Sequence, residues 1–306
     1  MKTNIYWPIF QNIEREINAL MFNIHMDDSQ LNVYSSKIID LILRSAAEIE
    51  SLAKELYILN SGPKTTNIKY DYDALMYLNT QWKLEDKIVL ISSPNCFVTH
   101  RELQPFKQSE PKTAKPDELT YSWNNAYQNL KHDRANSLNF GSVKYLLDIA
   151  AALYILNIYY RDLTFNLEKD SNGAEFDYSL GSSIFSIKVH TQKSIELLRA
   201  NQYNKSPDYD QCIYLIRLKA DKYLAARESL NSQMAKIQGD ILEKFIVPEV
   251  NEMIIKGEIT SDSNEIARII KEKLAKAITH QTLSQNLDPR AILDLEYEAV
   301  LNKSQY

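Results

Sequence analysis

The chain has 306 residues, of which 44% are hydrophobic and 25% are charged, and this composition is typical of one large globular domain or two small ones. A formal net charge of −5 argues against a protein that binds polyanions over its whole surface, although it is compatible with a local basic groove. Only six glycines are present, which argues against glycine-rich phosphate loops and all-β folds. The two cysteines, Cys96 and Cys212, form no metal motif and favour a reduced, cytoplasmic setting.

The N-terminal part of the chain is predicted to hold helices followed by one strand and a long loop. The spacing of apolar residues indicates helices over Asn4–Asn23 and Leu31–Asn60, and a shorter helix over Asp71–Trp82. Residues Lys87–Ser92 have the composition of a β-strand. The stretch Ser93–Glu118 carries four prolines and is predicted to be a long irregular loop, either functional or wrapped over the surface.

Two helices in the middle of the chain are the most informative segments. An amphipathic helix is predicted from about Tyr121 to Arg134, with Asn125, Asn129 and His132 spaced so that they form a polar stripe beside the apolar face. One interpretation makes this stripe a site for acid–base chemistry or phosphate contact. The structural alternative is that Asn129 and His132 cap the end of the helix.

The second of these helices opens after Gly141, with Ser142 as its N-cap, and continues to Arg161. It is apolar on nearly every side, which is typical of a helix that is buried in a core or spans a membrane. Asp148 and Asn157 interrupt the apolar run, which falls short of the ~20 residues needed to cross a bilayer. We therefore expect a central core helix and no membrane partner.

The last third of the chain is predicted to be helical. Before it, Phe176–Val189 has the composition of a short β-hairpin or flap. A near-heptad pattern predicts a long helix over Tyr223–Phe245 that Pro248 ends, suited to packing in a bundle or a dimer. Asp262 with Glu265 resembles a capping box, and a final helix is expected to start at the sequence Asp-Pro of residues 288–289. The expected domains are residues 1–200 and 208–306, or one domain that includes both.

Common catalytic and cofactor motifs are absent from the sequence. There is no Walker loop, GxGxxG, GxSxG, HExxH or CxxC, so no cofactor is expected. The histidines are dispersed along the chain, and no metal site is expected. They are His25, His100, His132, His190 and His280.

The central part of the chain resembles the HEPN superfamily of helical bundle proteins. The resemblance is carried by AEIESLAKEL at Ala47–Leu56, LQPF at Leu103–Phe106, and WNNAYQNLKHDR at Trp123–Arg134 followed by the apolar helix. It covers roughly Leu31–Arg161, with Ser183–Phe185 as a further short match. It implies a mainly α fold, a HEPN-type helical bundle with a long proline-containing loop, the short hairpin or flap, and a helical C-terminal third.

Many HEPN proteins are metal-independent ribonucleases that dimerise along these helices and take part in bacterial defence or toxin systems. Their motif is an arginine, four to six residues, and then a histidine. The histidine corresponds to His132, but the positions allowed for the arginine hold Asn125, Ala126 and Tyr127. The loss of the guanidinium weakens stabilisation of the charge on a phosphorane, and members with a degenerate motif are often non-catalytic RNA-binding or interaction modules.

The resulting hypothesis is a dimeric protein that binds RNA or a nucleotide in a groove around His132. Cleavage of RNA would be an additional activity. Three residues would carry catalysis. His132 would act as acid and base, Asn129 would position the phosphate, and Arg134 would interact with the charge of the phosphate. The expected binding residues are Asn125, Tyr127 and Lys131.

Two alternatives remain open at this point. The first is a non-catalytic interaction or dimerisation protein with a vestigial groove, in which Met234 and Ile237 of the long helix contact a second copy or an unknown protein partner. The second is a small-nucleotide sensor in which Tyr121 or Tyr127 stacks on a base.

Overall fold

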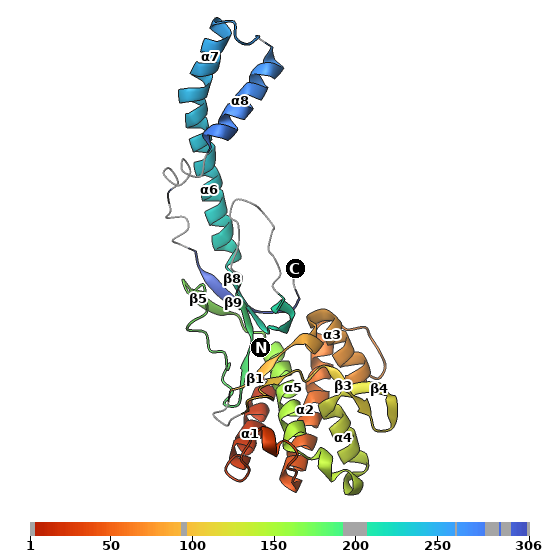
Figure 1. Cartoon of the computed structure of the whole chain (residues 1–306). Coiled ribbons are helices and arrows are strands. Elements are labelled where there is room, and N and C mark those ends of the chain that lie inside the picture. The colour runs from red at the N-terminus through yellow and green to blue at the C-terminus, as the bar shows by residue number, and fades with distance from the viewer. Residues whose placement is uncertain are drawn as a thin grey trace.

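The computed structural model describes residues 4–92, 97–191, 207–260, 262–278, 288 and 295–304. The helices of the first two-thirds of the chain are α1 (Tyr6–Leu20), α2 (Ser36–Leu59), α3 (Met76–Trp82), α4 (Ser122–His132) and α5 (Val143–Arg161). The later helices are α6 (Ala220–Ile241), α7 (Val247–Ile255) and α8 (Ser263–Ala277). Helices α1–α5 belong to a globular body, from which α6–α8 project as a long arm (Figure 1).

The prediction of a mainly α helical bundle is wrong, because the described strands form three sheets and the fold is mixed α and β. The sheets have the strand orders β2-β1-β6, β3-β4 and β5-β9-β8-β7. The strands before α5 are β1 (Val89–Ile91), β2 (Glu102–Leu103), β3 (Gln108–Lys112) and β4 (Lys115–Tyr121). Those after it are β5 (Phe165–Glu168), β6 (Phe185–Ile187), β7 (Val189–Thr191), β8 (Tyr214–Leu218) and β9 (Tyr297–Leu301).

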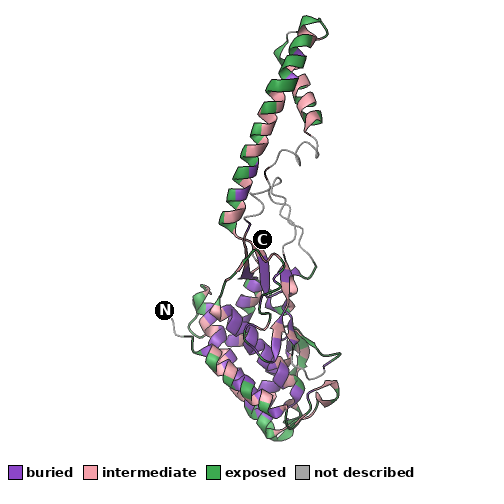
Figure 2. Ribbon diagram, turned by 90° about the vertical axis from the view of Figure 1, so that its left-hand side faces the viewer, coloured by how far each residue is buried: buried purple, intermediate pink, exposed green. Residues whose placement is uncertain are grey.

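Helix α5 is the central core helix, as predicted. It is packed along α2, and α1 and α4 also contact it. Of the described helices it alone is long and apolar enough to cross a membrane, but 83% of its most apolar window is buried inside the protein. Figure 2 shows this buried interior as a continuous purple region of the body. A helix that other elements enclose in this way needs no bilayer to cover its apolar sides.

Helix α4 is fixed to the body at its first turn. Trp123 is fully buried, and its indole Nε1 donates a 2.8 Å hydrogen bond to the carbonyl of Pro105. No side chain from the preceding residue, Tyr121, caps the helix. Instead, the carboxylate of Asp148 on α5 accepts a 3.2 Å hydrogen bond from the Trp123 backbone N–H. This carboxylate satisfies one of the free N–H groups at the helix start and sets the position of α4 on the core.

The predicted irregular loop over Ser93–Glu118 is wrong for its described part, which contains β2, β3 and most of β4. Strands β3 and β4 form an antiparallel hairpin with register shifts, in which Gln108 pairs with Tyr121. Of the two alternatives predicted for Phe176–Val189, the hairpin is also wrong, while the flap stays a prediction. Strand β6 pairs with β1, and β7 pairs in parallel with β8, so these two neighbouring strands belong to different sheets. Short strands of this kind depend on distant partners and carry little periodic signal of their own.

The four-stranded sheet joins segments from distant parts of the chain. Strand β9, near the C-terminus, lies between β5 and β8 and pairs antiparallel with both. The sheet therefore takes strands from both sides of the domain boundary expected between residues 200 and 208. That boundary stays a prediction, and the sheet ties the two segments together at the root of the arm (Figure 1).

The arm extends past the point where the sequence predicted its first helix to end. A π-helical turn at Leu242–Ile246 leads from α6 directly into α7, and Pro248 lies in the first turn of α7. A proline is tolerated there because its missing N–H has no partner to lose in a first turn. Most of the arm surface is exposed or half-buried (Figure 2). The expected helix start at residues 288–289 lies largely outside the described residues.

Candidate functional site

A pocket with a volume of about 570 Å³ opens between α4, the turn of the β3–β4 hairpin and the π-helical turn Tyr70–Leu75. We call it the amide-lined pocket, because two pairs of neighbouring residues on α4, one turn apart, contribute four side-chain amides to it. Its lining residues are Asp71, Tyr72, Lys112, Thr113, Ala114, Lys115, Glu118, Thr120, Asn124, Asn125, Gln128, Asn129, His132 and Asp133.

Two of the amides hold the hairpin turn against α4. Asn125 Oδ1 accepts hydrogen bonds from the backbone N–H and the hydroxyl of Thr113, at 3.2 and 3.3 Å. Asn129 Nδ2 donates to the Thr113 hydroxyl and to the backbone carbonyl of Asn125, both at 2.8 Å. The bond to the carbonyl four residues earlier is internal to α4 and does not cap its end, so the capping role expected for Asn129 stays a prediction. These contacts make the hairpin turn a fixed wall of the pocket.

The other two amides are oriented by a buried tyrosine. The Tyr70 hydroxyl donates a 2.5 Å hydrogen bond to Asn124 Oδ1 and accepts a 3.2 Å bond from Gln128 Nε2. Asn124 Nδ2 donates to the hydroxyl of Thr120 at 3.3 Å. Burial raises the pKa of Tyr70 far above its usual range, so its hydroxyl keeps the proton that it donates. The network thus fixes which amide atoms face the pocket.

Three amide groups in this pocket retain unused hydrogen-bonding capacity. Among the described residues, no partner exists for Asn125 Nδ2, which is a donor, or for Asn129 Oδ1 and Gln128 Oε1, which are acceptors. An amide carries two donor hydrogens and an acceptor oxygen, so each of these side chains can serve a ligand while keeping its internal bonds. The pocket therefore presents fixed donors and acceptors side by side.

The charges at the rim largely cancel. Glu118 accepts hydrogen bonds from Lys112 Nζ at 2.5 Å and from Lys115 Nζ at 2.9 Å. These bonds, with that from Lys112 as the larger cause, lower the pKa of Glu118 to about 2, so it remains ionised at neutral pH. Asp71 and Asp133 add negative charge to the same rim. The pocket has no excess of positive charge for a polyphosphate.

Tyr72 supplies an exposed aromatic ring at the pocket. Its side chain is 53% exposed, and its hydroxyl accepts a 2.7 Å hydrogen bond from Lys112 Nζ. The same ammonium lies 5.1 Å from the ring centroid, which holds the ring in place. An aromatic ring fixed in this way offers a flat surface on which a planar ligand can stack.

Of the sequence-predicted residues, His132, Asn125 and Asn129 line the pocket together. His132 is exposed at the end of α4, and its ring has no hydrogen-bond partner among the described residues. Arg134 is also exposed, in the turn Arg134–Asn136 that follows α4, and it does not line the pocket. No guanidinium therefore accompanies His132 in the pocket lining.

Tyr127 and Lys131 lie on another side of α4, facing α2. The Tyr127 hydroxyl donates to Glu50 Oε1 at 3.0 Å and accepts a 3.1 Å hydrogen bond from Lys131 Nζ. Tyr127 is only 7% exposed, and Tyr121 is 4% exposed and stacked on Trp123. Neither tyrosine can offer a free ring face to a base in this arrangement.

Sequence reasoning missed several residues of the pocket. Gln128 follows Asn124 by four positions, so the helical spacing of amides was a usable signal for it. Tyr72 and Thr113 reach the pocket only through the tertiary fold, and the sequence carries no local signal for them.

Within the described part of the chain, no three His, Cys, Asp or Glu side chains are grouped so that they can hold a metal ion. A scan against protein-family models finds no match, and neither a search of curated proteins nor a search of solved structures returns one. The geometry of the amide-lined pocket is therefore the basis for inferring a function.

Proposed function

We propose that the protein binds a nucleotide, either free or as one residue of single-stranded RNA, by taking its base into the amide-lined pocket. The observation that carries this proposal is that oriented side-chain amides with unused donors and acceptors share one pocket with an exposed tyrosine ring. Nucleobase edges present donors and acceptors next to each other, which Asn and Gln match, and bases stack on aromatic rings. A volume of about 570 Å³ lies in the range of ordinary small-molecule sites.

The base, rather than the phosphate, is the main recognition element in this proposal. Lys112 and Lys115 lie near enough to contact a phosphate, but Glu118 already neutralises much of their charge. Stacking of one base contributes about 1–3 kcal/mol by alanine substitution, and this contribution does not depend on salt in the way that phosphate contacts do. We therefore expect binding that persists at moderate ionic strength.

Cleavage of RNA is the less supported part of the hypothesis. His132 lines the pocket, but Arg134 does not, so no guanidinium faces a phosphorane there. We propose a binding function without cleavage. Labelled RNA incubated in EDTA with the wild type and with His132→Ala is expected to stay intact in both. Cleavage that is lost in His132→Ala would instead make the protein a metal-independent ribonuclease.

The binding proposal is tested with a matched pair of tyrosine variants. Tyr72→Ala removes the exposed ring of the pocket, while Tyr34→Ala removes a ring of similar exposure, 53% against 55%, that does not line it. Anisotropy of a labelled single-stranded RNA, with competition by free nucleotides, measures the affinity. Tyr72→Ala is expected to weaken binding about five- to 150-fold, the equivalent of about 1–3 kcal/mol. Equal affinity in both variants, or no binding by the wild type, would contradict the proposal.

A second candidate function, contact with another protein chain, is favoured by the arm. Phe245 and Ile255 are 68% and 85% exposed, which is unusual for such apolar side chains on a projecting helix. The heptad positions Met234 and Ile237 are half-buried. A homodimer through the arm predicts that light scattering shows a dimer and that Phe245→Glu yields monomers. A monomeric wild type would contradict the homodimer.

The setting of the protein belongs to the same proposal. Cys212 is a free thiol, which supports a reduced, cytoplasmic location. The role in bacterial defence that the HEPN resemblance implies would follow from RNA binding in that compartment.

A further inference from the structure

A second cavity, of about 240 Å³, lies on another side of the hairpin, between β2, β3 and the first turns of α4 and α5. We call it the Asp148 cavity after the carboxylate at its inner end. Four apolar side chains from different elements contribute to its walls. They are Leu31, Ile91, Leu103 and Leu147.

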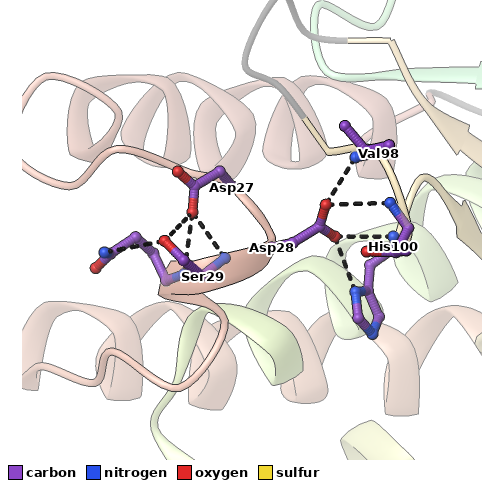
Figure 3. A network of polar contacts seen from close by, with 7 residues as sticks. Asp27, Asp28, Ser29, Val98 and His100 are labelled. Carbon is purple, nitrogen blue, oxygen red and sulfur yellow. Dashed lines mark hydrogen bonds and ion pairs between the residues drawn. The ribbon is translucent and has the colours of Figure 1, made fainter.

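The outer part of the Asp148 cavity is held in place by a tight set of hydrogen bonds. The carboxylate of Asp28 accepts from the backbone N–H groups of Val98, Thr99 and His100 at 2.8, 3.1 and 2.9 Å. It also contacts His100 Nδ1 at 2.8 Å, and Figure 3 shows these contacts converging on one carboxylate. The hydrogen bonds lower the pKa of Asp28 far below its usual range, so it stays ionised. His100, which lines the cavity, is thereby anchored.

Of the carboxylates that line the Asp148 cavity, Glu102 and Glu110 are paired with lysines and Asp148 is not. Lys144 Nζ lies 2.6 Å from Glu110 Oε1, and Glu102 lies 2.9 Å from Lys188 Nζ. Asp148 has no cationic side chain within 4.0 Å among the described residues. Lys107, at the rim, is exposed. The inner end of the cavity therefore holds a carboxylate without a counter-ion.

We propose that the Asp148 cavity binds a small organic ammonium ion, with its nitrogen at the Asp148 carboxylate and its hydrocarbon against the apolar walls. An ammonium would give the buried carboxylate the counter-charge that the protein does not supply. A metal ion is less suited, because no cluster of three metal-ligating side chains occurs among the described residues. An anion would meet Asp148 itself, while Lys144 is already held by Glu110.

The pH dependence of this binding follows from the groups that face Asp148. These are Lys144 on its own helix, Glu110 on β3, and the Ser122 hydroxyl and Trp123 N–H at the start of α4. Burial is the largest influence and raises the pKa of Asp148 to about 6. The ammonium needs the ionised carboxylate, so binding is expected to be full at pH 8 and to weaken as the pH falls below about 6.

Calorimetry on the full chain at pH 8, with butylammonium as the probe and 1-butanol as its neutral counterpart, tests this inference. The wild type is expected to bind butylammonium at one site and to bind 1-butanol much more weakly. Asp148→Asn, which keeps an acceptor for the Trp123 N–H, is expected to weaken butylammonium binding about tenfold or more. Glu228→Gln, an exposed carboxylate on α6, serves as the control and is expected to leave binding unchanged.

A second variant keeps the inference testable if Asp148→Asn does not fold. Ser109→Trp places a bulky ring at the exposed edge of the cavity without removing the carboxylate, and it is expected to block the probe. Loss of binding in either folded variant supports the inference. It is overturned if the wild type does not bind butylammonium, if both variants bind it unchanged, or if 1-butanol binds equally well.

Discussion

Replacing Asp148 by asparagine is expected to stabilise the free protein at neutral and alkaline pH. The side chain is half-buried in the wall of the Asp148 cavity, and desolvation of its carboxyl raises the pKa from the usual 3.8 to about 6. The Ser122 hydroxyl and the Trp123 N–H favour the ionised form, but they do not offset the loss of water. An asparagine can still accept the hydrogen bond from Trp123 and carries no charge to desolvate.

The size and sign of the effect follow from the two pKa values. A carboxyl whose folded-state pKa lies above its unfolded value stabilises the fold most where it is protonated, so its contribution is lost as the pH rises from 3.8 through about 6. At about 1.4 kcal/mol for each pH unit, the full difference is about 3 kcal/mol. Because Asp148 keeps some contact with the cavity, we expect an effect of about 2 kcal/mol at pH 8.

Urea unfolding followed by circular dichroism measures this difference between pH 4 and pH 8. Asp148→Asn is expected to exceed the wild type by about 2 kcal/mol at pH 8, with the advantage shrinking toward pH 4. Asp117→Asn, at an exposed position of β4, controls for general charge effects and is expected to show no such trend. A variant that is less stable than the wild type at pH 8 would refute the reasoning, because the charge at the start of α4 would then outweigh the cost of burial.

Three further predictions concern other parts of the molecule. Gly173→Ala is expected to lower the free energy of unfolding in urea by about 2 kcal/mol or more, because the position has φ +66° and an added Cβ would lie 2.2 Å from a side chain of β8. Gly257→Ala, at φ +69° in open space, is the control and is expected to lower it by about 1 kcal/mol. Trp123→Phe leaves the Pro105 carbonyl without its buried partner and should cost about 1–2 kcal/mol by the same assay. Glu118→Gln frees two lysines and should tighten calorimetric binding of a nucleoside monophosphate about two- to fivefold, with no gain for the nucleoside.

The long helices were predictable because the spacing of their apolar residues shows which face of each helix packs in the core. The stripe on Leu31–Asn60 and the broad apolar surface after Gly141 correspond to α2 and α5, which pack along each other. Both helices bury their apolar residues in the same core, so the pattern of each element is visible without knowledge of its partner.

The strands were not predictable in the same way. The segment Gln108–Tyr121 is polar and contains two prolines, yet it forms the β3–β4 hairpin because Asn125 and Asn129 of α4 bind the hairpin turn. Strand β9 forms only where β5 and β8 provide edges, and those strands are far away in the sequence. Pairing of this kind is decided by tertiary contacts that a local pattern does not carry.

Some of the predicted site residues share the pocket, and others lie on a different side of α4. Asn125, Asn129 and His132 follow helical spacing and do share the amide-lined pocket. Tyr127 and Lys131 each lie two positions after one of these asparagines. Residues two apart do not share a face of a helix, so both point to a different side of α4. Their contact with α2 follows from that spacing and separates them from the pocket.

Recognition of a base by the amide-lined pocket is best tested by comparing the binding of ligand fragments. Calorimetry of the wild type with adenosine, cytidine and ribose 5-phosphate separates the base from the phosphate. At least one nucleoside is expected to bind, and Tyr72→Ala is expected to weaken this binding while Tyr34→Ala does not. Ribose 5-phosphate is expected not to bind detectably. Binding of ribose 5-phosphate with the affinity of a whole nucleotide, together with no response to any nucleoside, would contradict recognition of a base by this pocket.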